Sequence, residues 1–468
     1  MHLTSWQPFM QIWAAVLLVL TNTVAAQAQS KYTVQMLTNV FRHGARTPVK
    51  NWLNYKWAND IGMGNLTYAG MRQHYFLGAQ IQQNYSALLD PTKYTNFDLQ
   101  VWSSPIFRTI QSAQSHLQGV YPPNIKTNDP NAGFGPDVTS PIYTPPITPF
   151  NYAFNQQKSV PYGVGMFPIA TDTAYLDFFF TVDQSCPNFK SLVATGRKDI
   201  DSTYNKLVQQ TCDKLQSFGY SPQQFGQDTC NLTMIDAAFD CLTANQFYNG
   251  QNEPGMSDDF YTELTNAKSI NSVLGFPTDQ AIGLFTDRIS RSIIDGMNDK
   301  MAGKTNLKYR VFSGHDTTLL PLMMKLDLIS LACLKNVYPD KVDPNCQTHP
   351  PYASSLIFEL VTDPNNNYLV RVLFNGAPVT AICDNPVDTY YCDYSAFKTE
   401  FGNRMYLKNF MQVCGNQYYE ASSLRSSLVV LIVGVSLATL AGIILVVQYS
   451  LHYSKLSKRW AKVQQVEV

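Results

Sequence analysis

The sequence predicts an α/β fold: a central mixed β-sheet flanked by helices, an inserted, mainly helical cap domain, and a single C-terminal transmembrane helix. Two apolar, β-favouring runs, 32–41 and 308–313, each end at a glycine-containing polar loop and lead on to a helical segment. Two further runs, 354–361 and 368–374, flank a turn signal and predict a hairpin. Between these parts, residues 124–276 are first rich in Pro, Gly and polar residues and then show helical periodicity. This composition predicts an inserted cap over the edge of the sheet where a ligand would bind.

The remaining elements follow from local periodicity. Residues 97–102 alternate between apolar and polar side chains, as a half-buried strand does. Apolar residues recur at helical spacing in four segments, at 66–85, 204–218, 234–247 and 278–301. On the first of these helices, Arg72 and His74 are expected to be structural, because most polar residues on a helix surface carry no chemistry.

Composition limits the class of protein. The chain has 468 residues, of which 45% are apolar and 15% charged, and this balance fits a folded protein rather than a disordered one. The net charge is zero, so the chain lacks the excess of positive charge that would indicate a nucleic-acid partner. No Cys-x-x-Cys pair or other metal-ligand spacing is present, and neither a metal nor a cofactor is expected.

Both ends of the chain carry targeting signals. Residues 1–28 read as a signal peptide with an apolar core and small residues for cleavage, although an uncleaved signal anchor is the alternative because the first residues lack Lys and Arg. Residues 428–448 are uncharged and apolar, long enough to span a bilayer core of roughly 30 Å. The basic residues that follow predict a cytoplasmic tail at 449–468, which places domain 29–427 in the lumen or outside the cell. Membrane lipid is therefore an expected partner.

Sequons and cysteines agree with that topology. Three Asn-x-Ser/Thr sequons predict glycosylation at Asn65, Asn84 and Asn231. All nine cysteines lie between Cys186 and Cys414, which indicates an oxidising compartment and leaves one thiol over. Local spacing favours two disulfide pairs, Cys333 with Cys346 and Cys383 with Cys392.

The loop after the first strand carries the strongest chemical signal, Arg42-His43-Gly44-Ala45-Arg46-Thr47-Pro48. Two guanidinium groups and one imidazole on a single turn suit a tetrahedral oxyanion, because arginine donates paired hydrogen bonds to phosphate oxygens. The segment resembles the R-H-G-x-R-x-P signature of the histidine acid phosphatases, in the branch similar to prostatic and lysosomal acid phosphatases.

Three more segments carry the same resemblance. Residues 66–73 resemble the family's L-T-x-x-G-M-R-Q segment, and Gly314-His315-Asp316 resembles its second signature. Arg108 follows a predicted strand and resembles the family's third arginine, in a segment that ends at Tyr121-Pro122-Pro123. The resemblance covers the chain from Val34 to Cys414.

The resemblance implies an acid phosphatase and assigns its residues. His43 would attack phosphorus and form a phosphohistidine, and Asp316 would protonate the leaving oxygen. Four other side chains would bind the phosphate of small phosphomonoester substrates: Arg42, Arg46, Arg108 and His315. The arginines disfavour an imidazolium, which keeps His43 nucleophilic in acid.

Other functions stay open at this point. A phytase or inositol-polyphosphate phosphatase and a lysophospholipid phosphatase are alternatives within the same class. The signal peptide, the transmembrane anchor and the sequons argue against a phosphoglycerate-mutase-like transferase or a cytosolic sugar bisphosphatase. A non-catalytic ectodomain is opposed by the presence of every expected polar residue. A homodimer is left open.

The resemblance also bears on the cysteines. Cys186 resembles the family's cap cysteine, whose partner near the end of the domain corresponds to Cys414. The family has a cysteine where this chain has Ser355, so Cys241, which resembles the usual partner of that cysteine, must pair with Cys212 or Cys230 or stay free.

The tail contains a candidate sorting signal. Tyr453-Ser-Lys-Leu456 resembles the tyrosine-x-x-bulky-apolar signal that clathrin adaptors bind as an extended peptide. It favours an endosomal or lysosomal membrane. The alternatives are an aromatic belt at the membrane interface with a cell-surface location, or a soluble luminal form after proteolytic release.

Overall fold

The computed structural model describes residues 32–91, 95, 97–122, 166–197, 201–337, 346–416 and 435–455. The chain divides into two units, 1–413 and 414–468, which are described separately. Three predicted features lie outside the described residues: the signal peptide at 1–28, the first part of the insertion up to residue 165, and Leu456 of the sorting signal.

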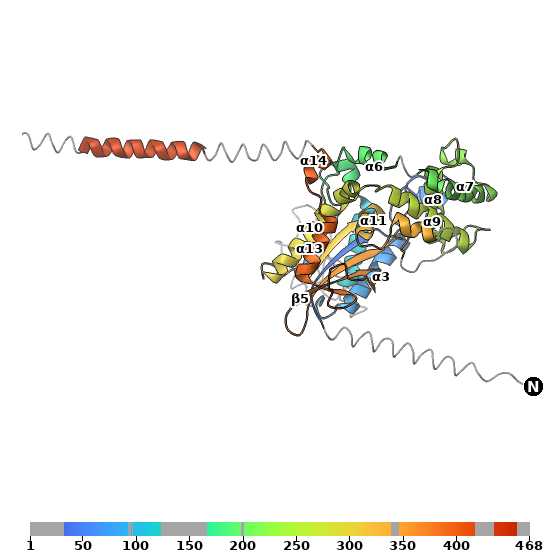
Figure 1. Cartoon of the computed structure of the whole chain (residues 1–468), viewed down its shortest axis with the longest axis horizontal. Helices are drawn as coiled ribbons and strands as arrows, with labels where there is room; N and C mark the ends of the chain where they lie inside the picture. Colours follow the sequence, from blue (N-terminus) through green and yellow to red (C-terminus); the bar gives the residue numbers. More distant parts are fainter. Residues whose placement is uncertain are drawn as a thin grey trace, which may run out of the picture. The chain divides into compact units, whose positions relative to one another are not determined.

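Seven strands of the described chain form one mixed sheet in the order β2-β3-β1-β4-β5-β6, with β7 also paired to β5. Figure 1 shows this sheet among the helices, with β5 labelled. Their bounds are β1 Thr33–Arg42, β2 Leu99–Ser103, β3 Tyr309–Gly314, β4 Ser355–Thr362, β5 Tyr368–Phe374, β6 Ala377–Pro378 and β7 Tyr391–Asp393. Strands β2, β3 and β1 are parallel, and the pairs from β1–β4 onward are antiparallel. The predicted mixed α/β sheet is confirmed, including the β4–β5 hairpin.

The register of β1 and β3 positions the functional loops. Arg42 is paired with Gly314 at the end of the parallel ladder. Because parallel strands end at the same edge of a sheet, the loops after β1 and β3 lie side by side. The last seven residues of β1 are buried, which agrees with the apolar run that predicted the strand.

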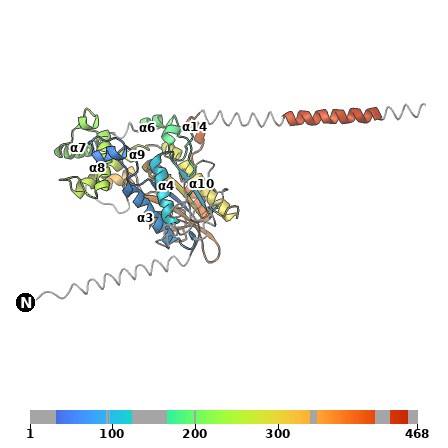
Figure 2. The same ribbon diagram turned by 180° about the vertical axis from the view of Figure 1, so that it is seen from behind.

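Helices cover both faces of the sheet. On one face, α3 (Tyr68–Asn84) and α4 (Phe107–Val120) pack over a core that includes Leu37, Ile81 and Leu117. Figure 2 shows these two helices next to each other. Their close approach depends on Gly78, where an added Cβ would lie 2.0 Å from the carbonyl oxygen of His116.

The opposite face carries α10 (Asp279–Met301), α11 (Asp316–Lys325) and α13 (Tyr394–Met405). Phe358 of β4 packs edge-on against Phe401 of α13, with ring centroids 5.5 Å apart. Thr278 caps α10 by accepting a hydrogen bond from the Ala281 N–H, at the helix start that the sequence predicts. Three shorter helices complete this unit: α2 (Lys56–Ile61), α12 (Leu331–Val337) and α14 (Phe410–Cys414).

The described part of the insertion is helical. It contains α5 Val182–Ser185, α6 Phe189–Arg197, α7 Asp201–Ser217, the 3₁₀ helix η3 Pro222–Phe225, α8 Leu232–Asn249 and α9 Asp258–Leu274. Helices α7 and α8 correspond to the predicted patterns at 204–218 and 234–247. Helix α9 is not singled out by the sequence reasoning, and the outer bounds of the cap stay predictions.

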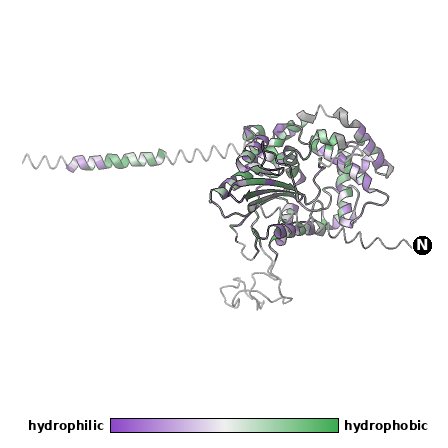
Figure 3. Ribbon diagram, turned by 60° about the horizontal axis from the view of Figure 1, so that its bottom comes forward, coloured by the Kyte–Doolittle hydropathy of each residue, from purple (hydrophilic) through white to green (hydrophobic). Residues whose placement is uncertain are grey.

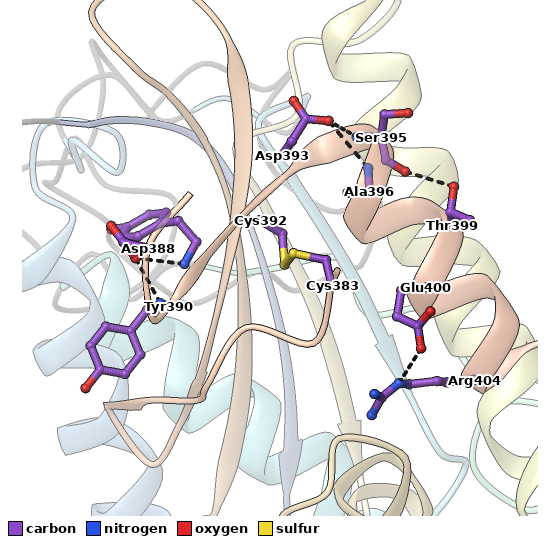
Figure 4. The surroundings of a disulfide bond; sticks show 11 residues. Cys383, Asp388, Tyr390, Cys392, Asp393, Ser395, Ala396, Thr399, Glu400 and Arg404 are labelled. Atoms are coloured by element: carbon purple, nitrogen blue, oxygen red, sulfur yellow. Dashed lines mark hydrogen bonds and ion pairs between the residues drawn. A yellow bond between two sulfur atoms is a disulfide. The ribbon is translucent and has the colours of Figure 1, made fainter. Parts of the chain in front are cut away.

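Three disulfides join residues close in sequence: Cys212–Cys230, Cys333–Cys346 and Cys383–Cys392. Figure 4 shows the last of these beside Asp393, whose carboxylate accepts hydrogen bonds from the first turn of α13. Cys241 is free and buried, so of the alternatives for this thiol the unpaired one holds. Cys186 and Cys414 are both disulfide-bonded, and their pairing with each other stays a prediction.

The second unit contains one described helix, Val435–Lys455, which is long and apolar enough to cross a membrane. Most of its length is hydrophobic, and hydrophilic residues gather at one end (Figure 3). The predicted span was 428–448, whereas the helix continues through residues 449–455, so Tyr453 is helical rather than part of an extended tail.

Candidate functional site

The six predicted site residues come together at the edge of the sheet where β1 and β3 end. Arg42 ends β1, and His43 and Arg46 follow it in the loop. Arg108 lies in the first turn of α4, and His315 and Asp316 lie at the start of α11. Contacts join the three groups: Arg42 Nη2 lies 3.1 Å from Asp316 Oδ2, Arg108 Nη2 lies 3.4 Å from His315 Nδ1, and the rings of His43 and His315 are 5.5 Å apart.

The loop that carries His43 is held through its backbone. The His43 N–H donates to the carbonyl of Gly314 at 3.0 Å, and the His43 carbonyl accepts from the Ala353 N–H at 3.1 Å. The next residue, Gly44, donates to Ser112 Oγ of α4 at 3.1 Å. These bonds tie the loop to three other segments, which fixes the direction of the imidazole.

The imidazole of His43 is buried and has one defined tautomer. Its Nδ1 lies 2.8 Å from the carbonyl oxygen of Gly44. A carbonyl can only accept, so Nδ1 carries the proton and the lone pair of Nε2 is free. Burial, and next the cations of Arg108, Arg42 and Arg46, hold the pKa of His43 well below its usual range, so the ring stays neutral in acid.

Arg42 and Arg46 are buried and Arg108 is half-buried, and all three are only partly partnered. Arg42 Nη1 donates to the Pro350 carbonyl at 2.6 Å, and Arg46 Nη1 donates to Asp240 Oδ1 at 2.7 Å. Within the described part of the chain, the Nε–H groups of Arg42, Arg46 and Arg108 have no hydrogen-bond partner. Buried donors without partners are costly, which sets these three groups apart from the arginine N–H groups that have partners.

Arg108 and His315 form one hydrogen-bonded unit. Because a guanidinium can only donate, its contact makes Nδ1 of His315 the acceptor and places the ring proton on Nε2, which lies 2.9 Å from Ser104 Oγ. Burial, and next the Arg108 cation, lowers the pKa of His315 to about 3. Burial and the neighbouring Arg46 lower the pKa of Arg108 to about 10, which leaves it charged in acid.

Asp316 is the first residue of α11, and its side chain is 24% exposed. Burial by itself raises the pKa of the carboxyl, but the Arg42 guanidinium and a hydrogen bond from His349 hold it well below its ordinary value. The carboxylate lines a cavity of about 350 Å³ that also contains Arg46, Lys268 and Asp240. A larger cavity, of about 540 Å³, is lined by residues of α9 to α13 and contains none of the predicted site residues.

Several site residues were not predicted. His349, in the loop before β4, has Nε2 3.2 Å from Asp316 Oδ2 and 3.3 Å from Arg42 Nη1. Tyr352 stacks over the Arg42 guanidinium at 4.4 Å, with its ring 5.8 Å from that of His43. Asp240 of α8 pairs with Arg46, and Lys268 of α9 pairs with Asp236.

The predicted modification sites differ in accessibility. Asn84, the last residue of α3, is exposed, whereas Asn65 and Asn231 are half-buried. Asn65 Nδ2 donates to the Ile61 carbonyl at 3.0 Å, and Asn231 caps α8. The described residues contain no cluster of three or more His, Cys, Asp or Glu that could hold a metal ion.

Comparison with known proteins gives consistent matches. The family model of the histidine phosphatase superfamily (branch 2) matches residues 33–375. The lysosomal acid phosphatase of Xenopus laevis is 26% identical over 372 residues, which cover 77% of this chain and 74% of that protein. The prostatic acid phosphatase of Bos taurus is 25% identical over 352 residues, which cover 73% and 77%.

Solved structures show the same fold at low identity. The phytase of Klebsiella sp ASR1 has a TM-score of 0.52 and 15% identity, covering 80% of this chain and 96% of that one. The Hafnia alvei phytase, without ligand, has a TM-score of 0.52 and 14% identity, covering 82% and 98%.

Proposed function

The chain belongs to branch 2 of the histidine phosphatase superfamily, and from this membership we propose that it is an acid phosphatase that hydrolyses phosphate monoesters through a phosphohistidine on His43. The observation that carries the proposal is the bond from Nδ1 of His43 to the Gly44 carbonyl, which leaves Nε2 unprotonated. A neutral, buried imidazole with a free lone pair, surrounded by three cations, suits attack on a phosphate in acid. The acid phosphatase names of the relatives agree with this reaction.

The phosphate would be held by Arg42, Arg46 and Arg108. Each guanidinium carries five N–H donors, and their Nε–H groups have no partner among the described residues, which leaves donors available for a bound phosphate. Preorganised donors of this kind stabilise the charge on the phosphoryl oxygens in the transition state.

His315 would be a fourth donor. To donate from Nδ1, the His315 ring must carry its proton on Nδ1 instead of Nε2. The Ser104 hydroxyl next to Nε2 permits this change of tautomer, because a hydroxyl can both accept and donate a hydrogen bond. The ring can therefore accept from Arg108 in the empty site and donate to phosphate in the filled one.

The reaction has two steps in which atoms and protons balance. The negative charge of the bound phosphate raises the pKa of Asp316, so that the carboxyl group carries a proton in the complex. In the first step, His43 Nε2 bonds to phosphorus, the bond from phosphorus to the leaving oxygen breaks, and that oxygen takes the proton of Asp316. In the second, the Asp316 carboxylate takes a proton from a water whose oxygen bonds to phosphorus. The phosphorus–nitrogen bond then breaks and its electron pair returns to Nε2, which regenerates the free enzyme.

Phytate hydrolysis is the second candidate, because the fold neighbours are phytases. The charges of the cavity favour simple monoesters instead. Arg46 is paired with Asp240 and Lys268 with Asp236, so two of its cations are already neutralised by cap carboxylates. A hexaphosphate would bring several negative charges close to these carboxylates, which is unfavourable.

The cellular location is a further part of the proposal. The lysosomal acid phosphatase relatives and the apolar helix Val435–Lys455 support a single-pass membrane protein of the endosomal or lysosomal system. In that arrangement the catalytic domain faces an acidic lumen and the tail is available to a clathrin adaptor.

The test uses the full-length chain in detergent with three substrates: p-nitrophenyl phosphate, phytate and lysophosphatidate, assayed between pH 3 and pH 8. We expect release of phosphate from p-nitrophenyl phosphate in acid and little from phytate. Faster release from phytate than from the aryl ester would favour the phytase. No release from any substrate would favour a non-catalytic ectodomain.

A further inference from the structure

His349 contacts the proposed proton donor directly, although neither the motifs nor the proposed reaction assigns it a role. Its Nε2 lies 3.2 Å from Asp316 Oδ2, and its ring is 3% exposed. Three other contacts hold the ring: Nδ1 lies 3.0 Å from Ser272 Oγ, the His349 backbone N–H donates to Ser269 Oγ at 2.7 Å, and Phe239 packs edge-on at 5.7 Å. A side chain with this many partners has one orientation.

The contacts define which nitrogen carries the proton. Nε2 lies between an acceptor, the Asp316 carboxylate, and a donor, Arg42 Nη1 at 3.3 Å. Arg42 Nη1 already donates to the Pro350 carbonyl at 2.6 Å. A hydrogen on Nδ1 would let Nε2 accept from Arg42, but it would leave a bare nitrogen facing the carboxylate oxygen, which is repulsive. We therefore place the hydrogen on Nε2, which donates it to Oδ2, while Nδ1 accepts from Ser272.

The two oxygens of Asp316 therefore have different surroundings. Oδ2 forms the ion pair with Arg42 Nη2 and is the oxygen next to His349 Nε2, so both neighbouring donors lie on its side of the carboxyl group. Oδ1 accepts only from the N–H of the adjacent Thr317, at 2.8 Å, among the described residues. An acid proton on this carboxyl group is therefore directed to Oδ1.

Ser272 lets His349 hold this position over a range of pH. Its hydroxyl also lies 2.8 Å from the Lys268 carbonyl in the preceding turn of α9. When His349 is neutral, Ser272 donates to Nδ1. When the ring is doubly protonated in acid, Ser272 can accept from Nδ1 and donate to the Lys268 carbonyl instead.

We infer that His349 is a positioning residue for Asp316: by filling Oδ2 together with Arg42, it places the transferable proton on Oδ1 and keeps the carboxyl group in one orientation for the leaving oxygen. The inference rests on the proposed phosphatase reaction. It adds no step to that reaction, because the proton still passes from Asp316 to the leaving oxygen and returns from water.

Other charges around the pair are part of its electrostatics. Those that face Asp316 and His349 are Arg42 of β1, Arg46 of the loop, Arg108 of α4, Lys268 of α9, His315 of α11 and Tyr352 of the loop before β4. Lys268 and Arg46 are paired with Asp236 and Asp240. Arg42 contacts both Nε2 and Oδ2, so the test also measures phosphate binding, which reports on Arg42.

The test compares His349→Leu with His349→Gln in the full-length chain. Leucine removes the donor to Oδ2, whereas glutamine can keep an N–H there. For an alkyl phosphate, we expect His349→Leu to lower kcat/KM about tenfold and to move the alkaline limb of its pH profile up by about one unit, because the ionised carboxylate loses a stabilising donor. For p-nitrophenyl phosphate, whose leaving oxygen needs a proton less, we expect a loss of less than about threefold. Glutamine should restore most of the wild-type profile.

Controls separate this role from packing and from phosphate binding. Phe239→Leu disturbs the packing of the His349 ring but no hydrogen bond, and its pH limb should stay in place. The inhibition constant of inorganic phosphate should change little in His349→Leu. A rise in that constant with equal losses on both substrates would mean that His349 only supports Arg42, and would overturn the inference, as would an unmoved pH limb.

A measurement that needs no substrate turnover tests this inference separately from the proposed function. Carboxyl ¹³C NMR titration of Asp316 in the wild type and in His349→Leu measures the same interaction in the absence of substrate. We expect a higher Asp316 pKa in the leucine variant, and an equal pKa would contradict the inference even if the wild type is an active phosphatase. A wild type inactive on both esters would count against the proposed function alone.

Discussion

Gly44 and Gly70 meet backbone to backbone. A Cβ added to Gly44 would lie 2.3 Å from the carbonyl oxygen of Gly70, and a Cβ added to Gly70 would lie 2.2 Å from that of Ala45. The nucleophile loop therefore rests directly on the first turn of α3, with no side chain between them. Thr67, the N-cap of this helix, also donates to the Ala45 carbonyl, at 2.8 Å.

This contact predicts the result of Gly70→Ala. The methyl group would meet backbone atoms that cannot turn away, so we expect a loss of about 3 kcal/mol in the free energy of unfolding. Activity should fall further than stability explains, because the loop that carries His43 must move. Urea denaturation and kcat/KM measure both effects, with Gln83→Ala on the exposed side of α3 as the control. A variant that keeps wild-type activity and stability would show that the loop can shift freely.

The nucleophile is tested by His43→Ala. We expect turnover of p-nitrophenyl phosphate to fall by about a thousandfold or more, because no other neutral imidazole is free to form the covalent intermediate. The fold should persist, since the backbone bonds of His43 to Gly314 and Ala353 do not involve the side chain. Circular dichroism and binding of inorganic phosphate check the fold and the arginines. Substantial turnover by the folded variant would remove His43 from the covalent step.

The proton donor is tested by Asp316→Asn. Asparagine keeps the shape of the side chain but has no acid proton, so alkyl phosphates should lose about 100-fold in kcat/KM. Aryl phosphates should lose less than about tenfold, because a phenoxide leaves without full protonation. A plot of log kcat/KM against the pKa of the leaving group should become steeper in the variant. An unchanged slope would contradict general-acid catalysis by this residue.

Stability should depend on pH through two buried histidines that the proposed reaction does not use. His74 donates to the Arg42 carbonyl at 3.0 Å, and burial lowers its pKa to about 3. His116 lies 2.6 Å from the Tyr309 hydroxyl, and burial lowers its pKa well below the usual value. The folded state keeps both rings neutral, whereas the unfolded chain protonates them below about pH 6.5. Stability therefore falls as the pH drops below about 6.5, by about 2 kcal/mol at pH 5 for His74, and His116 acts in the same direction.

Thermal unfolding between pH 4 and pH 8 measures this dependence. His74→Gln keeps a donor to Arg42 but cannot titrate, so its Tm should fall less steeply with acid than that of the wild type. Parallel Tm curves for the two proteins would show that His74 is not linked to acid stability.

The tail makes a prediction about location. Tyr453 is exposed near the end of the helix Val435–Lys455. If an adaptor reads it, this last turn must unwind into an extended peptide, and Tyr453→Ala should raise the amount of protein at the plasma membrane several-fold. Surface biotinylation of cells that express each form measures the change. No increase would leave the tyrosine as part of an interfacial belt.

The sheet could be predicted from the sequence for a physical reason, and so could the position of six polar residues at its edge. An apolar strand followed by glycine and polar side chains is a local pattern, and β1 and β3 both have it. Once both strands are placed in parallel, the loops that carry His43 and His315 must meet. Arg108 was found only through the resemblance, because an arginine at a helix start carries no special signal by itself.

The rest of the site depends on the path of the chain in space. His349 lies between a threonine and two prolines in a loop, and nothing in that stretch indicates that its ring meets Asp316. Asp240 belongs to α8, whose apolar residues give no sign that this carboxylate reaches Arg46. Tyr352 lies in the same loop as His349, and nothing near it in the sequence indicates that its ring covers the Arg42 guanidinium. Such contacts are set by how the cap and the loops pack, and one sequence does not encode them in a periodic pattern.

The place of β1 in the sheet has a consequence for biosynthesis. Asn39 and Tyr309, which are hydrogen-bonded across neighbouring strands, lie 270 residues apart in the chain. At a synthesis rate of roughly 5–20 residues per second, the ribosome needs roughly 15 to 50 seconds to produce the partner of a strand that it has already released. During that interval β1 is an apolar, unpaired strand, which is the kind of segment that chaperones bind and that aggregates when they are absent. A nascent chain that stops before residue 309 would therefore contain the complete Arg-His-Gly motif and still be a client for degradation.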